Sequence, residues 1–126
     1  MTRKTINGIQ QVGIGVSDAK AVFNWYRKHL GFDILVFEDA SPANLMKRYT
    51  GGSVHDRYAL LALNMIGGGG LEIWQFKSRE PKASEVPFQW GDLGINAMKI
   101  RCKHITKAYA QLEKLRLTFL SEMNQM

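Results

Sequence analysis

One acidic side chain, Glu72, lies inside a short apolar and aromatic stretch of the chain. The stretch Gly70–Phe76 reads GLEIWQF and is typical of a β-strand. Because alternate side chains of a strand point to opposite faces, Glu72 shares one face with Trp74 and Phe76. A carboxylate beside tryptophan within a strand is costly unless a partner compensates it. The candidate partners are a metal ion, a cationic side chain, or the water at an open cleft.

A second polar residue, Gln11, lies in the run 9–16, IQQVGIGV, which also reads as a strand. Gln11 shares its face with Gly13 and Gly15, so that this face is bare and another group can approach the backbone closely. The opposite face, with Val12, Ile14 and Val16, is apolar. We expect a helix to cover that apolar face.

The helix that follows is predicted over 19–30, where apolar residues recur at helical spacing. Ser17 and Asp18 offer an N-cap, and Gly31 suits a C-cap. Further strands are predicted at 32–37, 57–65 and 70–76, with a long loop over 38–56 that has the length of a lid or binding loop. After a polar linker, the pattern predicts a strand at 94–102, a helix at 105–115 and the start of a strand at 117–120.

Composition excludes several classes of protein. The 126 residues suffice for one domain with one core. No apolar run approaches the roughly 20 residues of a membrane span, and the N-terminus lacks the apolar segment of a secretory signal. The single cysteine, Cys102, makes no internal disulfide and no paired-cysteine zinc site. These features favour a cytoplasmic protein that acts away from membranes.

The net charge of +6 comes from basic residues scattered along the chain. No run of five or six Lys or Arg is present, so nucleic acid is not the expected partner. A solvated basic surface is the simpler interpretation, and an acidic small-molecule substrate is the second.

The order of elements restarts in the last third of the chain. The stretch from Gly94-Ile95 repeats the strand-then-helix order of the stretch from Gly8-Ile9, and His104 falls at the place of Asp18. The likeness is one of pattern rather than of identical residues. Repeated units of this kind usually pack about a pseudo-twofold axis, with a site between them.

The combination of QQVGIGVSD, WYRKHLGF and GLEIWQF resembles the vicinal oxygen chelate superfamily, which includes glyoxalase I, bleomycin-resistance proteins and extradiol dioxygenases. The resemblance implies an α+β fold of paired βαβββ modules. The first module would span 1–80 and the linker 81–93. Residues 94–126 would form the start of the second module, which is too short to be complete. Its missing strands would come from a longer parent protein or from a partner chain. An unpaired sheet edge of this kind invites dimerisation.

The resemblance also implies a metal site. The ligand positions on the first and fourth strands correspond to Gln11 and Glu72, an oxygen-rich pair suited to Mn, Fe, Ni or Zn. Glu72 would be a ligand and a catalytic proton shuttle. The corresponding position in the second module is Ala97, which binds no metal. A symmetric homodimer could supply four ligands where one chain supplies two.

The remaining candidate residues concern the pocket. Trp74 and Phe76 could line an apolar substrate pocket, and Lys99 and Arg101, on the face of Ala97, would make its other half basic. Four further residues are expected to have no catalytic role. His55 would lie in a loop, His29 on the surface and His104 at a helix start. Cys102 would be a small residue of the core.

The function implied by the resemblance is that of a glyoxalase- or dioxygenase-like enzyme, similar to lactoylglutathione lyase. It would act on a small oxygenated metabolite through a divalent metal. Two alternatives stay open, because one fold hosts many activities. The first is a metal-free small-molecule binding module, as in antibiotic-resistance relatives, which Ala97 favours. The second is a structural dimerisation domain.

Overall fold

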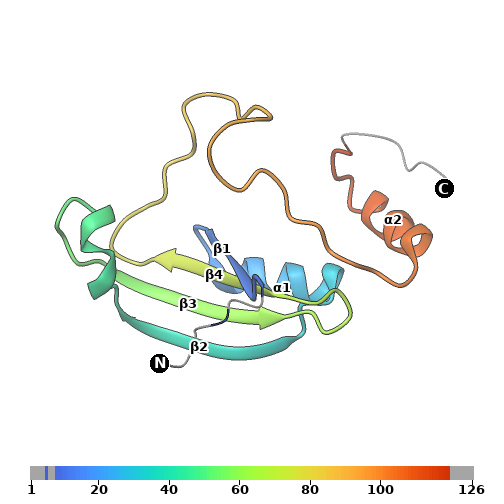
Figure 1. The fold of residues 1–126 in the computed structure, drawn as a ribbon, viewed down its shortest axis with the longest axis horizontal. Helices are drawn as coiled ribbons and strands as arrows, with labels where there is room; N and C mark the ends of the chain where they lie inside the picture. The colour runs from blue at the N-terminus through green and yellow to red at the C-terminus, as the bar shows by residue number, and fades with distance from the viewer. Residues whose placement is uncertain (1–4, 6–7, 120–126) are drawn as a thin grey trace.

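A four-stranded sheet with one helix packed on it forms the first two thirds of the protein (Figure 1). The structure, a computed structural model, describes residue 5 and residues 8–119. The sheet has the order β1-β4-β3-β2, in which β1 and β4 are parallel and the other pairs are antiparallel. The elements in chain order are β1 (Gln11–Gly15), α1 (Ala19–Leu30), β2 (Ile34–Pro42), the 3-10 helix η1 (Asn44–Tyr49), β3 (Asp56–Leu63), β4 (Gly70–Phe76) and α2 (Ile105–Glu113).

Helix α1 begins and ends where its sequence predicts. The Asp18 side chain accepts a hydrogen bond of 2.9 Å from the backbone N–H of Ala21, which satisfies one of the free donors of the first turn. Gly31 ends the helix in the left-handed conformation, with φ of 72°. The prediction of a helix over Ala19–Leu30 is therefore confirmed.

The core lies between α1 and one face of the sheet. Its centre is formed by buried residues of the helix start, of the segment after it and of β3 and β4: Ala19, Phe32, Leu60, Ala62, Leu71 and Ile73. Ile14 and Val16 pack against this centre, as expected for the apolar face of the first strand. Within residues 8–119, no helix packs on the opposite face of the sheet, which carries Glu72 and Trp74 and is called the open face below.

Strand β2 is longer than its sequence predicts. The expected strand ended at residue 37, but β2 continues to Pro42, and its last pair joins Pro42 to Asp56. The expected long loop therefore contains the end of β2 and η1. Backbone hydrogen bonds to β3 extend the strand through Glu38 and Asp39, because an edge strand tolerates charged side chains. A register shift between Leu35 and Phe37 adjusts the pairing.

The strands predicted after the linker do not form. Residues 94–104 belong to no strand, although Met98 and Ile100 contact the core as their alternation indicated. A strand requires a hydrogen-bonded neighbour, and among the described residues none pairs with this segment. Residues 117–119 likewise form no strand, and Leu120 lies outside the described residues. Alternating burial therefore occurs here without sheet pairing.

The predicted repeat is therefore only partly present. Helix α2 follows at Ile105–Glu113, close to its predicted bounds, and His104 takes the N-cap position without a side-chain cap bond. Cys102 was expected in the core, but it is exposed. That expectation was wrong because it rested on the strand alternation of 94–102.

Asn64 holds together the end of α1 and the glycine turn before β4. Its side chain is 6% exposed; it donates to the carbonyl of Leu30 at 2.7 Å and accepts from the N–H groups of Ile66 and Gly67 at 2.9 and 2.6 Å. Three backbone groups thus depend on one amide. The turn leads directly into β4, the strand that carries Glu72.

Replacing Asn64 with alanine is expected to lower the free energy of unfolding by about 2–4 kcal/mol, because three backbone groups lose their partner. Urea denaturation measures the change. Asn24→Ala, at an exposed position of α1, is the matched control and is expected to change stability by less than about 0.5 kcal/mol. Equal effects of the two variants would contradict the role of Asn64.

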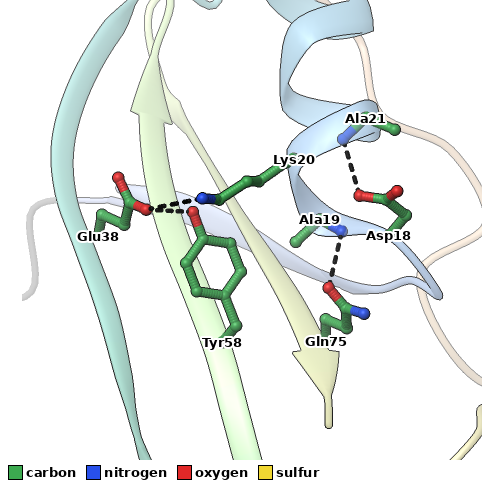
Figure 2. Close-up of polar contacts among 7 residues, drawn as sticks. All are labelled: Asp18, Ala19, Lys20, Ala21, Glu38, Tyr58 and Gln75. Carbon is green, nitrogen blue, oxygen red and sulfur yellow. Dashed lines mark hydrogen bonds and ion pairs between the residues drawn. The ribbon is translucent and has the colours of Figure 1, made fainter.

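Polar contacts also join α1 to the sheet (Figure 2). The hydroxyl of Tyr58 donates to Glu38, and Lys20 lies 3.8 Å from the same carboxylate. At the start of the helix, Gln75 accepts from the backbone N–H of Ala19 at 3.2 Å. The pKa of the Tyr58 phenol is raised to about 12. The larger cause is desolvation by burial, and the smaller is the hydrogen bond to Glu38.

The raised pKa of Tyr58 predicts a loss of stability at high pH. The folded protein holds the phenolic proton more tightly than the unfolded chain, so this contribution is complete below about pH 10 and is lost as the pH rises towards about 12. Urea unfolding at a series of alkaline pH values should show a smaller loss for Tyr58→Phe than for the parent protein. Tyr49→Phe, at an exposed tyrosine, should behave as the parent does.

Candidate functional site

The pairing of β1 with β4 brings Gln11 and Glu72 together on the open face. The two residues are 61 positions apart in the chain, and the parallel register sets Gln11 opposite Gly70 and Gly13 opposite Glu72. The amide Nε2 of Gln11 donates to Oε2 of Glu72 at 2.5 Å, and both side chains are half-buried. The two residues that the sequence singled out separately thus form one polar pair.

Trp74 completes the hydrogen bonding of this pair. Its indole Nε1–H donates to Oε1 of Glu72 at 2.7 Å, so each carboxylate oxygen accepts one hydrogen bond from the protein. A carboxylate has about four acceptor positions, so further positions stay available for a ligand or an ion. The carboxylate is held in one orientation by two neighbours on the same face.

Arg57 is a further residue of the site, and the sequence did not single it out. Its guanidinium lies 4.8 Å from the centre of the Trp74 ring and forms an ion pair with Asp39 of β2. The hydroxyl of Ser41, together with Arg57, lowers the pKa of the Asp39 carboxyl below its ordinary value. No sequence motif indicates Arg57. The register of β3 against β4, which sets Arg57 opposite Phe76, brings it to the site.

Phe76 extends the aromatic part of the open face beyond Trp74. The two rings meet edge to face with their centres 6.0 Å apart. His55 packs against Phe76 at 5.7 Å, and its Nδ1 lies 3.1 Å from the hydroxyl of Ser78. Arg79 lies 5.8 Å from the Phe76 ring. His55, expected as a loop histidine, is thus half-buried and borders the aromatic row.

The predicted basic half of the pocket is not assembled. Lys99 is exposed and lines a cavity of about 130 Å³ that Gln11 and the glycine turn also line. Arg101 instead lines a separate groove beside α2, together with His29 and Leu112. Ala97 is exposed. The expected shared face of Lys99 and Arg101 depended on a strand at 94–102, which does not form.

The comparisons with known proteins agree with this fold. The family model described as the Glyoxalase/Bleomycin resistance protein/Dioxygenase superfamily matches residues 8–126. The chain belongs to this superfamily. No curated protein sequence matches this glyoxalase-superfamily chain.

A solved structure is also similar to this member of the glyoxalase superfamily. It is the crystal structure of a glyoxalase family protein from Bacillus cereus, with a TM-score of 0.61 and 15% sequence identity. The match covers 100% of this chain and 83% of the other. At this identity the likeness supports the fold alone, which is α+β as the sequence predicted.

Two findings bear on partners. Members of the superfamily commonly bind small molecules and form dimers. Among residues 5 and 8–119, no helix combines the length and the apolar character that crossing a membrane requires.

Proposed function

We propose that the protein acts on a small oxygenated metabolite, which it binds on the open face through a divalent cation held in part by Gln11 and Glu72. The observation that carries the proposal is the direct contact between these two side chains at 2.5 Å. Both belong to the open face, which no helix covers in the part of the chain that the structure describes. Superfamily membership makes a small-molecule ligand the expected partner.

Gln11 and Glu72 together supply only part of the ligands that a divalent ion requires. Gln11 offers one amide oxygen, and Glu72 offers a carboxylate. In the described part of the chain, no three His, Cys, Asp or Glu side chains lie close enough together to hold a metal. Catalytic metal sites usually have three protein ligands and one open position. We therefore infer that a second copy of the chain supplies the missing ligands, so that one ion binds per two chains.

A bound divalent ion supplies Lewis acidity, which polarises the oxygens of a metabolite. The side chains of this protein would do the remaining work. The indole N–H of Trp74 orients the carboxylate of Glu72. In this orientation Glu72 would accept a proton from the metabolite. Because Gln11 is neutral, it would compensate less of the charge of the cation than a carboxylate ligand would. The cation would then be the stronger Lewis acid.

A metal-free binding module is the second candidate function. The observation that favours it is that Gln11 and Trp74 each already donate a hydrogen bond to Glu72, so that both oxygens of its carboxylate have a protein partner. Ala97, which offers no ligand, agrees with it. In this case the Glu72 carboxylate would accept hydrogen bonds directly from the small molecule.

Calorimetric titration of the purified protein with Mn²⁺, Ni²⁺ and Zn²⁺ distinguishes the two functions. We expect one ion per two chains, and Glu72→Gln and Gln11→Ala should each weaken binding by about tenfold or more, because each removes one of few ligands. Sedimentation analysis should show that the ion favours the dimer.

Glu80→Gln is the matched control, because Glu80 is an exposed carboxylate beyond the end of β4. It is expected to bind the ions as the parent protein does. An equal loss in the Glu80 and Glu72 variants would mean that binding is unspecific. Absence of binding for all three ions would overturn the metal-dependent function and leave the metal-free one.

A further inference from the structure

A largely apolar groove of about 340 Å³ lies between the end of α1 and α2, and it is called the helix groove below. Helix α2 lies beyond the end of the sheet where β3 turns into β4 (Figure 1). The apolar lining comes from both helices, from the turn before β4 and from the segment before α2: Leu30, Ile66, Met98, Ile100, Ile105 and Leu112. Neither Gln11 nor Glu72 lines the helix groove, so it is separate from the site on the open face.

Helix α2 contributes one apolar stripe to the helix groove. Ile105, Ala108 and Leu112 all line it and have the spacing of a single helical face. No residue of α2 is buried, and Ile105 is 62% exposed. Ile66, in the turn before β4, is 56% exposed. The groove thus leaves apolar side chains in water, and covering them with an apolar molecule is favourable.

Two cations belong to the lining of the helix groove. Arg101 and Lys103 lie in the segment directly before α2. None of the described residues that line the groove is acidic. Within residues 8–119, neither cation forms an ion pair. An apolar groove with two uncompensated cations is complementary to a molecule that has an apolar chain and an anionic end.

His29, at the end of α1, adds a hydrogen-bond donor to this lining. Its ring packs against Trp25, with the ring centres 5.3 Å apart, and its Nδ1 is buried with no hydrogen-bond partner in the described part of the chain. Burying a lone pair there is less costly than burying an N–H, so the neutral ring carries its hydrogen on Nε2. A donor at Nε2 suits an anionic ligand.

We propose that the helix groove binds a medium-chain carboxylate, whose alkyl chain covers the stripe of α2 and whose carboxylate pairs with Arg101 and Lys103. A carboxylate fits because a guanidinium can donate two parallel hydrogen bonds to it. A methylene group has roughly the liquid volume of a water molecule, about 30 Å³, so the groove holds a chain of about ten carbons. The volume also lies in the range of small-molecule pockets. The protein would therefore bind a second small molecule away from the open face.

Three probes separate the contributions of chain and charge: octanoate, 1-octanol and acetate. The first has both, the second has the chain without the charge, and the third has the charge with almost no chain. Calorimetric titration measures the affinity of each. We expect octanoate to bind about tenfold or more tightly than either other probe, because only octanoate uses both parts of the groove.

The reactivity of Cys102 reports where octanoate binds. This residue is the single cysteine of the chain, it is exposed, and it lines the helix groove. N-ethylmaleimide, an uncharged thiol reagent, modifies it. We expect saturating octanoate to slow this reaction by about threefold or more, because the ligand covers the thiol and its carboxylate disfavours the reactive thiolate.

The head of the ligand is tested by replacing both cations. Arg101→Gln combined with Lys103→Gln should weaken octanoate binding by about tenfold or more and leave 1-octanol binding unchanged. Lys107→Gln combined with Lys114→Gln is the matched control, because both lysines are exposed residues outside the lining and the loss of charge is the same. The control is expected to bind octanoate as the parent protein does.

The chain of the ligand is tested on α2 itself. Ala108→Glu places a carboxylate in the helix groove, where it repels the ligand and fills space, and it should weaken octanoate binding by about tenfold or more. Ala110→Glu is the matched control, since Ala110 is exposed on the same helix and does not line the groove. Glutamate is a good helix former, so α2 should persist in both variants, which circular dichroism checks.

Several results would overturn the proposal. These are no binding of octanoate to the parent protein, equal binding of 1-octanol, an unchanged reaction rate of Cys102, or equal effects of a variant and its matched control. If octanoate does not bind and Ala108→Glu converts a dimer into a monomer in sedimentation analysis, the groove is a contact between two copies of the chain. None of these results depends on the ion titration, which tests the open face.

Discussion

The parallel pairing of β1 with β4 is the constraint on which the site depends. Parallel neighbours need a long crossover connection, and here α1, β2 and β3 provide it. The pairing joins the first and last strands of the module and sets Gly13 opposite Glu72. A slip of one residue in β4 would turn Glu72 into the core and Leu71 onto the open face. Burial of Leu71 and Ile73 beneath α1 therefore holds Glu72 in its place.

The two faces of the sheet divide stability from binding. The helix side contains the aliphatic cluster at the centre of the core, together with the contacts of Tyr58 and Gln75 to the rest of the module. The open side contains a row of half-buried polar and aromatic side chains linked by hydrogen bonds and ring contacts. Substitutions of these half-buried side chains can therefore be used to study binding, whereas Ala59 and Leu61 of the same face are buried.

Local pattern was sufficient to predict part of this structure. The cap residues Asp18 and Gly31 predicted the bounds of α1. The apolar and aromatic stretch GLEIWQF predicted β4, and the alternation of side chains along a strand predicted the face of Glu72. The approach of Gln11 to Glu72 was expected only through the resemblance to a superfamily. The bare face of Gly13 and Gly15 was evident from alternation alone.

Features that depend on distant partners were not predictable from pattern. The polar end of β2 is a strand only because β3 pairs with it, and residues 94–102 alternate like a strand without such a neighbour among the described residues. Arg57 reaches Trp74 through the register of β3 against β4, which no local spacing encodes. Register and pairing are properties of the assembled sheet, so they cannot be predicted from a short stretch of neighbouring residues.

The most direct test of the site is to map where a cation binds by paramagnetic broadening of amide signals. Mn²⁺ added in small amounts to ¹⁵N-labelled protein broadens the signals of nuclei close to the ion. If Gln11 and Glu72 hold the ion, their signals and the indole N–H of Trp74 should disappear first, while those of α2 persist. Broadening that begins instead at other exposed carboxylates, such as Glu80 or Asp92, would contradict a cation site built on Gln11 and Glu72.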